Sequence, residues 1–131
     1  MMGPHKNLKV WHKLMELVNL IYTLTRKYPQ YEIFGLCSQM QRAAVSIPSN
    51  IAEGYGRSSN KDLIHFLHNA LGSSNELDTQ IIISKYQGYI TDAEFRQMED
   101  LNESVNKMLS ALIDKRKLYE SAGTKDLKPQ T

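Results

Sequence analysis

Apolar residues recur at spacings of three and four along most of the chain, which is the period of an amphipathic helix. One stripe spans residues 10–28, and Pro29 then ends the helix because proline cannot donate the next helical hydrogen bond. A second stripe follows residue 94. The first stripe consists of Val10, Trp11, Leu14, Leu17, Val18, Ile21, Leu24 and Tyr28, and the second of Phe95, Met98, Leu101, Val105, Met108, Leu112 and Tyr119.

Polar and glycine-containing breaks divide the middle of the chain into two further helices. The break at residues 54–60 is rich in Gly, Ser and Asn, which predicts helices over about residues 32–57 and 61–87. Asn60 is expected to cap the later helix at its start, and Gly88 is expected to end it.

The last helix opens with a capping box, because Thr91 and Glu94 have the spacing at which each side chain bonds the other's backbone amide. Four helices of about 18–27 residues joined by short loops predict an all-α fold, an antiparallel up-down four-helix bundle. We expect the bundle domain to span residues 8–120, with flexible tails at 1–7 and 121–131.

The predicted second helix has three different faces when its residues are placed about 100° apart. A solvent-exposed face usually carries Lys and Glu. One face here is small and uncharged, so we expect the helix to be covered by its own bundle and by another copy of the chain. The apolar face is Leu36, Met40, Ala43, Ile47 and Ile51, the polar face is Gln39, Arg42, Ser46, Asn50, Glu53 and Arg57, and the small face is Ser38, Gln41, Val45, Ser49, Ala52 and Gly56.

The polar face has two interpretations. In the first it is a buried or interfacial hydrogen-bond network, in which Glu53 pairs with Arg57 and Arg42 reaches Glu76 on the next helix. In the second it is a ligand or nucleic-acid surface, with Arg42 and Arg57 on phosphates.

Two residues, Pro48 and Gly72, lower the stability of the helices in which they are predicted to lie. Pro48 costs about 3 kcal/mol, and Ser46 and Ser49 are candidates to bond the backbone that it leaves free. Either it bends the helix to fit its neighbours or it positions a binding surface. Gly72 costs about 1 kcal/mol relative to Ala and is expected where another backbone approaches closely.

Composition and charge narrow the class of protein. The chain has 131 residues, 41% of them hydrophobic, and a net charge of +2, which is typical of a single globular domain. No apolar run is long enough to span a bilayer and the N-terminus lacks a secretory signal, so we expect a cytoplasmic protein without a membrane partner. The basic excess lies near the N-terminus, at Lys6, Lys9, Lys13, Arg26 and Lys27.

No motif indicates catalysis, a metal or a cofactor, and we expect a non-enzymatic protein. His65 and His68 share a helix face, but the Glu-x-x-His pairs of di-iron bundles are missing. The single cysteine, Cys37, is expected to be a small buried or interfacial residue. Four tyrosines are either base-stacking candidates or ordinary bundle residues, namely Tyr22, Tyr55, Tyr86 and Tyr89.

Three blocks of the sequence resemble a known family. The segment 46–57, Ser-Ile-Pro-Ser-Asn-Ile-Ala-Glu-Gly-Tyr-Gly-Arg, follows Gln-Met-Gln-Arg-Ala-Ala at 39–44. This central block resembles the signature of the four-helix-bundle proteins encoded within 23S rRNA intervening sequences. The segments 8–11 and 66–77 are similar to the other two blocks of that family. The accessory variability protein of diversity-generating retroelements belongs to the same fold family.

The resemblance implies a small antiparallel four-helix bundle that assembles as a ring-like homopentamer and has no established enzymatic activity. The retroelement relative binds nucleic acid and its reverse transcriptase through a basic surface. The signature or interface residues that the resemblance and the helix faces single out are Gln39, Arg42, Ser46, Pro48, Asn50, Glu53, Gly54, Gly56, Arg57, Gly72 and Glu76.

The sequence therefore predicts a homo-oligomeric, nucleic-acid-associated accessory module whose ligand is RNA or DNA. The alternative is a protein-only scaffold for a partner encoded nearby. Contacts with phosphates would come from Lys6, Lys9, Lys13, Arg26, Lys27, Arg42 and Arg57.

Overall fold

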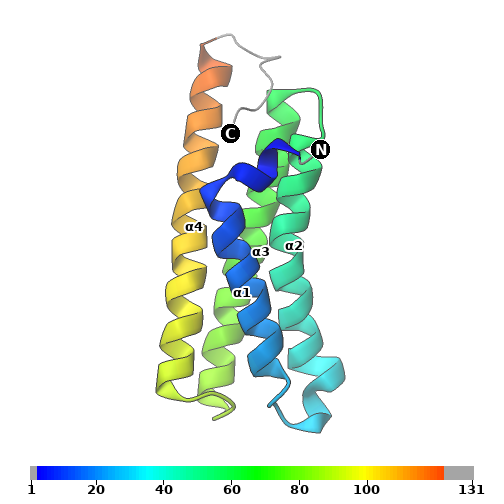
Figure 1. Ribbon diagram of the computed structural model, residues 1–131, viewed down its shortest axis with the longest axis vertical. Coiled ribbons are helices and arrows are strands. Elements are labelled where there is room, and N and C mark those ends of the chain that lie inside the picture. Colours follow the sequence, from blue (N-terminus) through cyan, green and yellow to red (C-terminus); the bar gives the residue numbers. More distant parts are fainter. Residues whose placement is uncertain (1–2, 123–131) are drawn as a thin grey trace.

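The computed structural model describes residues 3–122, which form four long helices. Figure 1 shows each helix running antiparallel to the one before it, so the fold is the predicted up-down bundle. The start of the first helix and the end of the last lie at one end of the bundle, here called the terminal end, and the opposite end is called the distal end. The helices are α1 (Lys9–Thr25), α2 (Ser38–Tyr55), α3 (Asn60–Tyr86) and α4 (Asp92–Ser121).

The chain between α1 and α2 differs from the prediction of one helix from residue 32 onward. It forms two short turns, η2 (Gln30–Glu32) and η3 (Ile33–Cys37), before α2 begins. Gly35 interrupts the helical path with φ −109° and ψ −113°. The Glu32 carboxylate accepts a hydrogen bond from the Leu36 amide at 3.1 Å, so a side chain holds the turn in addition to its backbone bonds.

The core lies between the four helices and confirms most of the predicted apolar stripes. All five residues of the apolar face predicted for the second helix are buried, four of them on α2 and Leu36 in η3. On α4 the prediction is only partly right, because Leu109 and Ile113 are buried while Phe95, Leu101, Met108 and Leu112 are only partly buried. The core-facing line of α4 runs through Met98, Asn102, Val105, Leu109, Ile113 and Arg116.

The core also contains a polar pair that fixes α3 against α4. The Ser74 hydroxyl donates to Oδ1 of Asn102 at 2.9 Å, and Nδ2 of Asn102 donates to the Ser74 carbonyl at 3.0 Å. Both residues are buried. Because each loses its partner if the helices slide by one residue, the pair specifies their register.

The cap predicted at Asn60 is wrong. The N-cap of α3 is Ser59, whose hydroxyl accepts from the Asp62 amide at 3.1 Å. Asn60 is fully buried inside the first turn, and its Nδ2 donates to the Arg116 carbonyl of α4 at 2.8 Å. The Asn60 side chain, which the local sequence predicts to cap α3, therefore makes a tertiary contact with α4 instead.

The α3–α4 connection follows the prediction. Gly88 has φ +76°, a left-handed conformation that favours glycine. Its amide donates to the Lys85 carbonyl and the Tyr89 amide to the Ser84 carbonyl, which together form a Schellman ending for α3. The capping box of Thr91 and Glu94 is present at the start of α4, with bonds of 2.9 and 3.1 Å.

Helices α2 and α3 approach each other closely at Gly54. A Cβ at this position would lie 2.9 Å from the Leu63 and Phe66 side chains, so a larger residue would force the helices apart. Gly72 is different, because a Cβ there would meet nothing within 4 Å. Nothing within residues 3–122 explains its place in the middle of α3.

The segment Pro4–Asn7, expected in a flexible tail, forms a helical turn, η1, at the terminal end. The His5 ring packs against the Trp11 ring with their centroids 4.8 Å apart. Burial lowers the pKa of His5, and the charge of Lys6 adds to this effect. Residues 123–131 of the other expected tail lie outside the described part of the chain.

Candidate nucleic-acid interface

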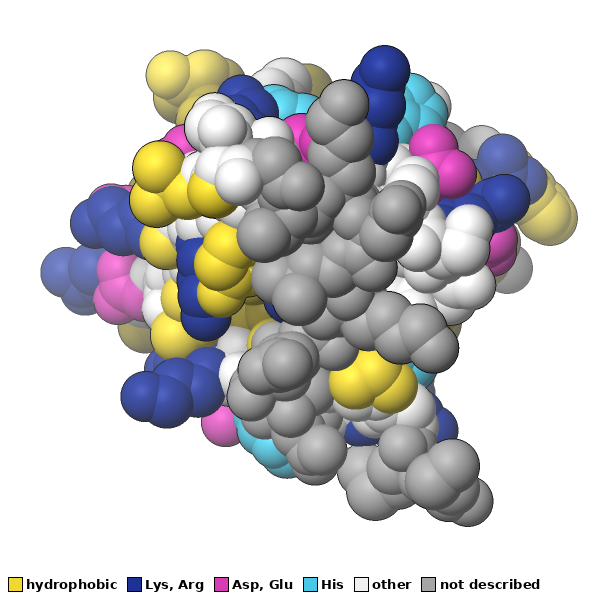
Figure 2. Space-filling model, turned by 90° about the horizontal axis from the view of Figure 1, so that it is seen from above, with side chains coloured by type: hydrophobic (Ala, Val, Ile, Leu, Met, Phe, Trp, Pro, Cys, Tyr) yellow, Lys and Arg dark blue, Asp and Glu magenta, His cyan; other side chains and the backbone are white. Residues whose placement is uncertain are grey.

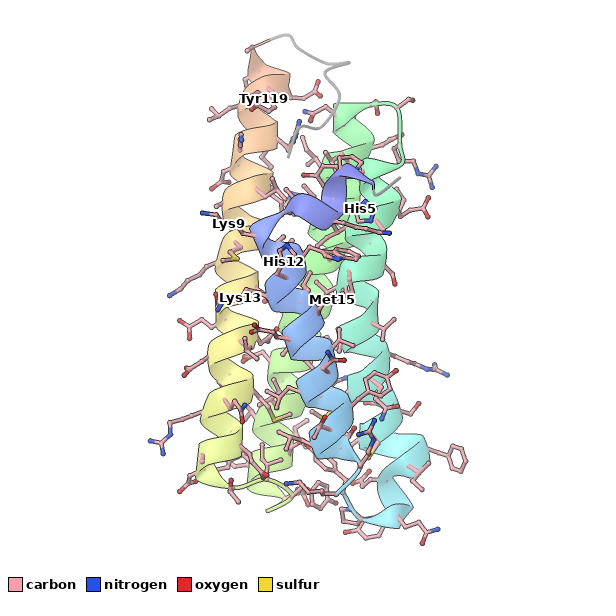
Figure 3. The ribbon with its side chains drawn as sticks, in the orientation of Figure 1. His5, Lys9, His12, Lys13, Met15 and Tyr119 are labelled. Carbon is pink, nitrogen blue, oxygen red and sulfur yellow. The ribbon has the colours of Figure 1, made fainter. Side chains whose placement is uncertain are left out.

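The seven basic residues predicted to contact nucleic acid do not form one cluster. Lys6, Lys9 and Lys13 lie at the terminal end, whereas Arg26 and Lys27 follow α1 at the distal end. Lys13 and Arg26, the nearest members of the two groups along the helix, are 13 residues apart, which corresponds to about 20 Å at 1.5 Å per residue. Figure 2 looks along the bundle and shows Lys and Arg side chains around its circumference, interspersed with Asp and Glu. Figure 3 places Lys9 and Lys13 on the side of α1 that faces α4.

Two of the seven are engaged by carboxylates of the same chain. Lys27 pairs with Glu94. Arg57 pairs with Glu53 at 2.9 Å, as predicted, and its guanidinium lies 4.9 Å from the centre of the Phe66 ring. The expected contact between Arg42 and Glu76 is not formed. In the part of the chain that the structure describes, five of the seven make no ion pair, namely Lys6, Lys9, Lys13, Arg26 and Arg42.

The polar face of α2 divides between its two interpretations. The Ser46 hydroxyl bonds the Ser73 hydroxyl of α3 at 2.9 Å, and Nδ2 of Asn50 donates to the Ser46 carbonyl at 2.8 Å. These bonds match the structural interpretation, and they direct the Ser46 hydroxyl toward α3 rather than toward the backbone beside Pro48. Pro48 itself is buried within α2. Arg42 is exposed and takes no part in this network.

Two neighbouring depressions follow the seam between α1 and α2, and together they are called the α1–α2 groove. One has a volume of about 360 Å³ and contains Arg26, the other about 400 Å³ and contains Arg42. Gln41 lines both, so they are continuous at that residue. The first is lined by Thr25, Arg26, Tyr28, Gln30, Ile33, Cys37 and Gln41, and the second by Tyr22, Ser38, Gln41, Arg42, Val45 and Ser46.

The lining of the α1–α2 groove combines apolar side chains with Arg, Gln, Ser and Thr side chains and contains no carboxylate. Its floor is fixed, because Nε2 of Gln41 donates to Oγ1 of Thr25 at 3.1 Å and that hydroxyl donates to the Ile21 carbonyl at 2.7 Å. Burial raises the pKa of the Cys37 thiol, and the charge of Glu32 raises it further. The thiol therefore stays protonated at neutral pH and is a poor nucleophile.

The α3–α4 seam has the opposite character. A depression of about 370 Å³ there is lined by Asp78, Glu99 and Glu103 together with Asn and Lys side chains. Burial raises the pKa of Glu99 to about 8, and the neighbouring Asp78 contributes to the shift. Because α1 and α3 each pack against α2 and α4, the α1–α2 and α3–α4 seams lie on opposite sides of the bundle. The molecule thus has an arginine-containing face and an acidic face.

Two exposed aromatic side chains belong to the turns between α1 and α2, which adjoin the distal end of the α1–α2 groove. Ile33 lines the groove beside Arg26, and the next residue, Phe34, is 96% exposed. Tyr31 is 78% exposed. Phe34 is not singled out by the sequence, because the apolar pattern places it in a regular helix that starts at about residue 32. The available signal was Gly35, directly after an apolar pair and six residues after Pro29.

The fold defines a class first: a small antiparallel bundle of four helices. The chain belongs to the 23S rRNA-intervening sequence protein family, whose model matches residues 6–111. It is similar to a solved structure from Bacteroides thetaiotaomicron VPI-5482, a protein of unknown function from the S23 ribosomal protein family. The two share 25% sequence identity with a TM-score of 0.72, over 80% of this chain and 95% of that one. No curated protein matches the chain closely enough to count as a relative.

None of the helices within residues 3–122 is long and apolar enough to cross a bilayer. No three His, Cys, Asp or Glu side chains of this region are arranged to hold a metal ion. His65 and His68 are exposed on α3.

Proposed function

We propose that this protein is a cytoplasmic, homo-oligomeric, non-enzymatic accessory module that binds RNA along the α1–α2 groove. The observation that carries the proposal is the carboxylate-free lining with two exposed arginines, Arg26 and Arg42. The name of the family, which refers to an intervening sequence of 23S rRNA, supports RNA as the anion.

The chemistry of the groove suits a phosphodiester strand. A guanidinium presents several N–H donors in a planar fork that matches a phosphate. Arg26 and Arg42 lie on opposite sides of Gln41, so phosphates bound by both would place a strand across the fixed amide floor. Phosphate contacts position such a strand, and the amide and hydroxyl groups between them are available to bases and sugars.

Self-association is supported by features that the isolated bundle leaves unused. Gly72 sits in the middle of α3 with open space around it, although glycine costs about 1 kcal/mol there relative to Ala. Val45 and Ser49 of the small face of α2 are exposed. Such surfaces allow another backbone to approach closely. The family resemblance favours a pentamer, and five copies of a chain with net charge +2 would carry a net charge of +10.

Binding measured across a salt series tests the RNA proposal. The variant Arg26→Ala/Arg42→Ala should bind structured RNA at least about tenfold more weakly, and its slope of log affinity against log salt should fall by about 1 to 2 units. The control Arg96→Ala/Lys117→Ala removes two exposed cations elsewhere, with the same change in net charge, and should bind nearly as the wild type does. Equal losses in the two variants, or no loss in either, would refute the groove as the site.

A protein-only scaffold remains the second candidate, and one observation favours it. A depression of about 280 Å³ between α1 and α4 is mainly apolar, with two lysines in its lining. It is lined by Leu8, Lys9, Val10, Met108, Ala111, Leu112 and Lys115. If this groove is the functional one, a protein partner should co-purify after nuclease treatment, and Leu112→Asp should release it while RNA binding stays intact.

A further inference from the structure

We infer that the α1–α2 groove accepts single-stranded RNA and that Phe34 stacks on an unpaired base at its distal mouth. The inference rests on the proposed function, and it adds the strand type and the residue that selects it. Its basis is one exposed aromatic residue in the turn that adjoins a groove with two arginines and no carboxylate in its lining.

The backbone turn that carries Phe34 is held in place by specific contacts. Gly35 takes a non-helical conformation directly after it, and a Cβ on Gly35 would lie 2.7 Å from Oε1 of Glu32. That oxygen accepts from the Leu36 amide at 3.1 Å, and Oε2 of the same carboxylate accepts from the Tyr89 hydroxyl at 2.8 Å. The turn that carries Phe34 is therefore fixed to the α3–α4 connection. Because the backbone of this turn is already fixed, only the side chain of Phe34 has to be ordered when the ring stacks on a base.

Ile33 links the residue proposed for phosphate contact to the residue proposed for base stacking. Ile33 and Arg26 line the same depression, and Phe34 is the neighbour of Ile33 in the chain. A nucleotide whose phosphate meets the Arg26 guanidinium therefore has an apolar surface within reach of its base. Combining cationic backbone contacts with aromatic platforms is how proteins bind single strands.

The same arrangement disfavours a duplex. Paired bases are stacked inside an A-form helix and do not offer a face to a protruding phenyl ring. Gln30 and Ser38 also line the groove, and such amide and hydroxyl groups can bond base edges and the ribose 2′-hydroxyl. The acidic α3–α4 face, with Asp78, Glu99 and Glu103, repels a polyanion from the opposite side of the bundle.

The test compares three labelled probes of equal length at one salt concentration: an unstructured RNA, its perfect RNA duplex and the DNA strand of the same sequence. The wild-type protein should bind the unstructured RNA at least about tenfold more tightly than the duplex. Phe34→Ala should lower affinity for the unstructured RNA by about 5- to 150-fold while its salt slope stays unchanged. Phe34→Trp should retain tight binding because it restores an aromatic face.

Leu118→Ala is the matched control, since it removes an exposed apolar side chain at the terminal end, and it should change nothing. Because Phe34 is almost fully exposed, its variants should keep the wild-type circular dichroism spectrum. Equal or tighter binding of the duplex, or an inert Phe34→Ala variant, would overturn the inference. Equal affinity for the DNA strand would overturn the assignment to RNA.

The results also distinguish base stacking on Phe34 from the proposed RNA binding in the α1–α2 groove. If Arg26→Ala/Arg42→Ala weakens binding but Phe34→Ala does not, the groove binds RNA without stacking on Phe34. If neither substitution weakens binding, the groove is not the RNA site and both ideas fail.

Discussion

The Tyr89 hydroxyl donates a hydrogen bond to the Glu32 carboxylate at 2.8 Å, which joins the α1–α2 connection to the α3–α4 connection at the distal end. The other oxygen of that carboxylate accepts from the Leu36 amide. Hydrogen bonding to Tyr31 and Glu32 raises the pKa of Tyr89, so its hydroxyl keeps its proton at neutral pH. One carboxylate thus fixes the position of the turn that carries Phe34.

Removing this bond should loosen the turn without unfolding the bundle. In Tyr89→Phe the ring remains but the donor is lost, so amide hydrogen exchange in residues 33–37 should become severalfold faster. Exchange in the centre of α3 should not change. Thr79→Val, which removes an exposed hydroxyl on α3 bonded only to its own helix, serves as the control. Unchanged exchange at the turn would show that Glu32 does not hold it through Tyr89.

The buried pair of Ser74 and Asn102 should be expensive to break. In Asn102→Ala the Ser74 hydroxyl loses its acceptor and the Ser74 carbonyl loses the Asn102 donor inside the core, while Asn106 still donates to the hydroxyl. This loss should cost about 1 to 3 kcal/mol of unfolding free energy. Urea denaturation measures the loss. Asn69→Ala changes the same residue type at an exposed position of α3 and should cost far less. A loss at Asn102 no greater than at Asn69 would contradict the assigned role.

Gly54 and Gly72 should respond oppositely to the same substitution. Gly54→Ala places a Cβ against Leu63 and Phe66 and should destabilise the fold by about 1 to 3 kcal/mol. Gly72→Ala meets nothing within the chain and should stabilise the isolated bundle by up to about 1 kcal/mol.

The same two variants also test self-association. If Gly72 faces another copy, Gly72→Ala should weaken the oligomer in sedimentation velocity experiments even though it stabilises the protomer. A variant of higher stability and unchanged oligomeric state would remove Gly72 from the proposed interface.

Stability should fall as the pH rises from about 5 to 8. The pKa of Glu99 is raised from 4.5 to about 8 in the folded protein, chiefly by burial and then by the neighbouring Asp78. The folded state therefore holds a proton over this range that the unfolded state has released, and this contribution to stability is lost as the pH rises through the folded pKa. In Glu99→Gln the Tm should vary less between pH 5 and 8 and should exceed that of the wild type at pH 8. If the Tm of the wild type does not fall more steeply than that of Glu99→Gln between pH 5 and 8, the raised pKa of Glu99 is contradicted.

The sequence was sufficient for the fold because apolar periodicity, Gly88 and the Thr91–Glu94 capping box act locally. It was insufficient at Asn60, where a tertiary bond to the Arg116 carbonyl competes with capping and leaves that role to Ser59. The sequence also did not predict the turn at Gly35. An apolar run beside a glycine does not by itself distinguish the start of a helix from an exposed turn.

The candidate site was predicted only in part. Arg26 and Arg42 were named from the sequence, but their common groove depends on how α1 and α2 pack, which no local pattern encodes. Lys27 and Arg57 were named with them and are engaged by Glu94 and Glu53. Charge counting along a sequence does not distinguish a cation with an internal partner from one available to a ligand.

The most direct test of the RNA-binding groove is a map of photo-crosslinks from a single-stranded RNA containing 4-thiouridine, read by mass spectrometry on the wild-type protein. The account predicts crosslinked peptides within residues 22–46, which hold the α1–α2 groove and Phe34, and loss of these crosslinks in Arg26→Ala/Arg42→Ala. Crosslinks concentrated on α3 and α4, or spread evenly over the bundle, would contradict it.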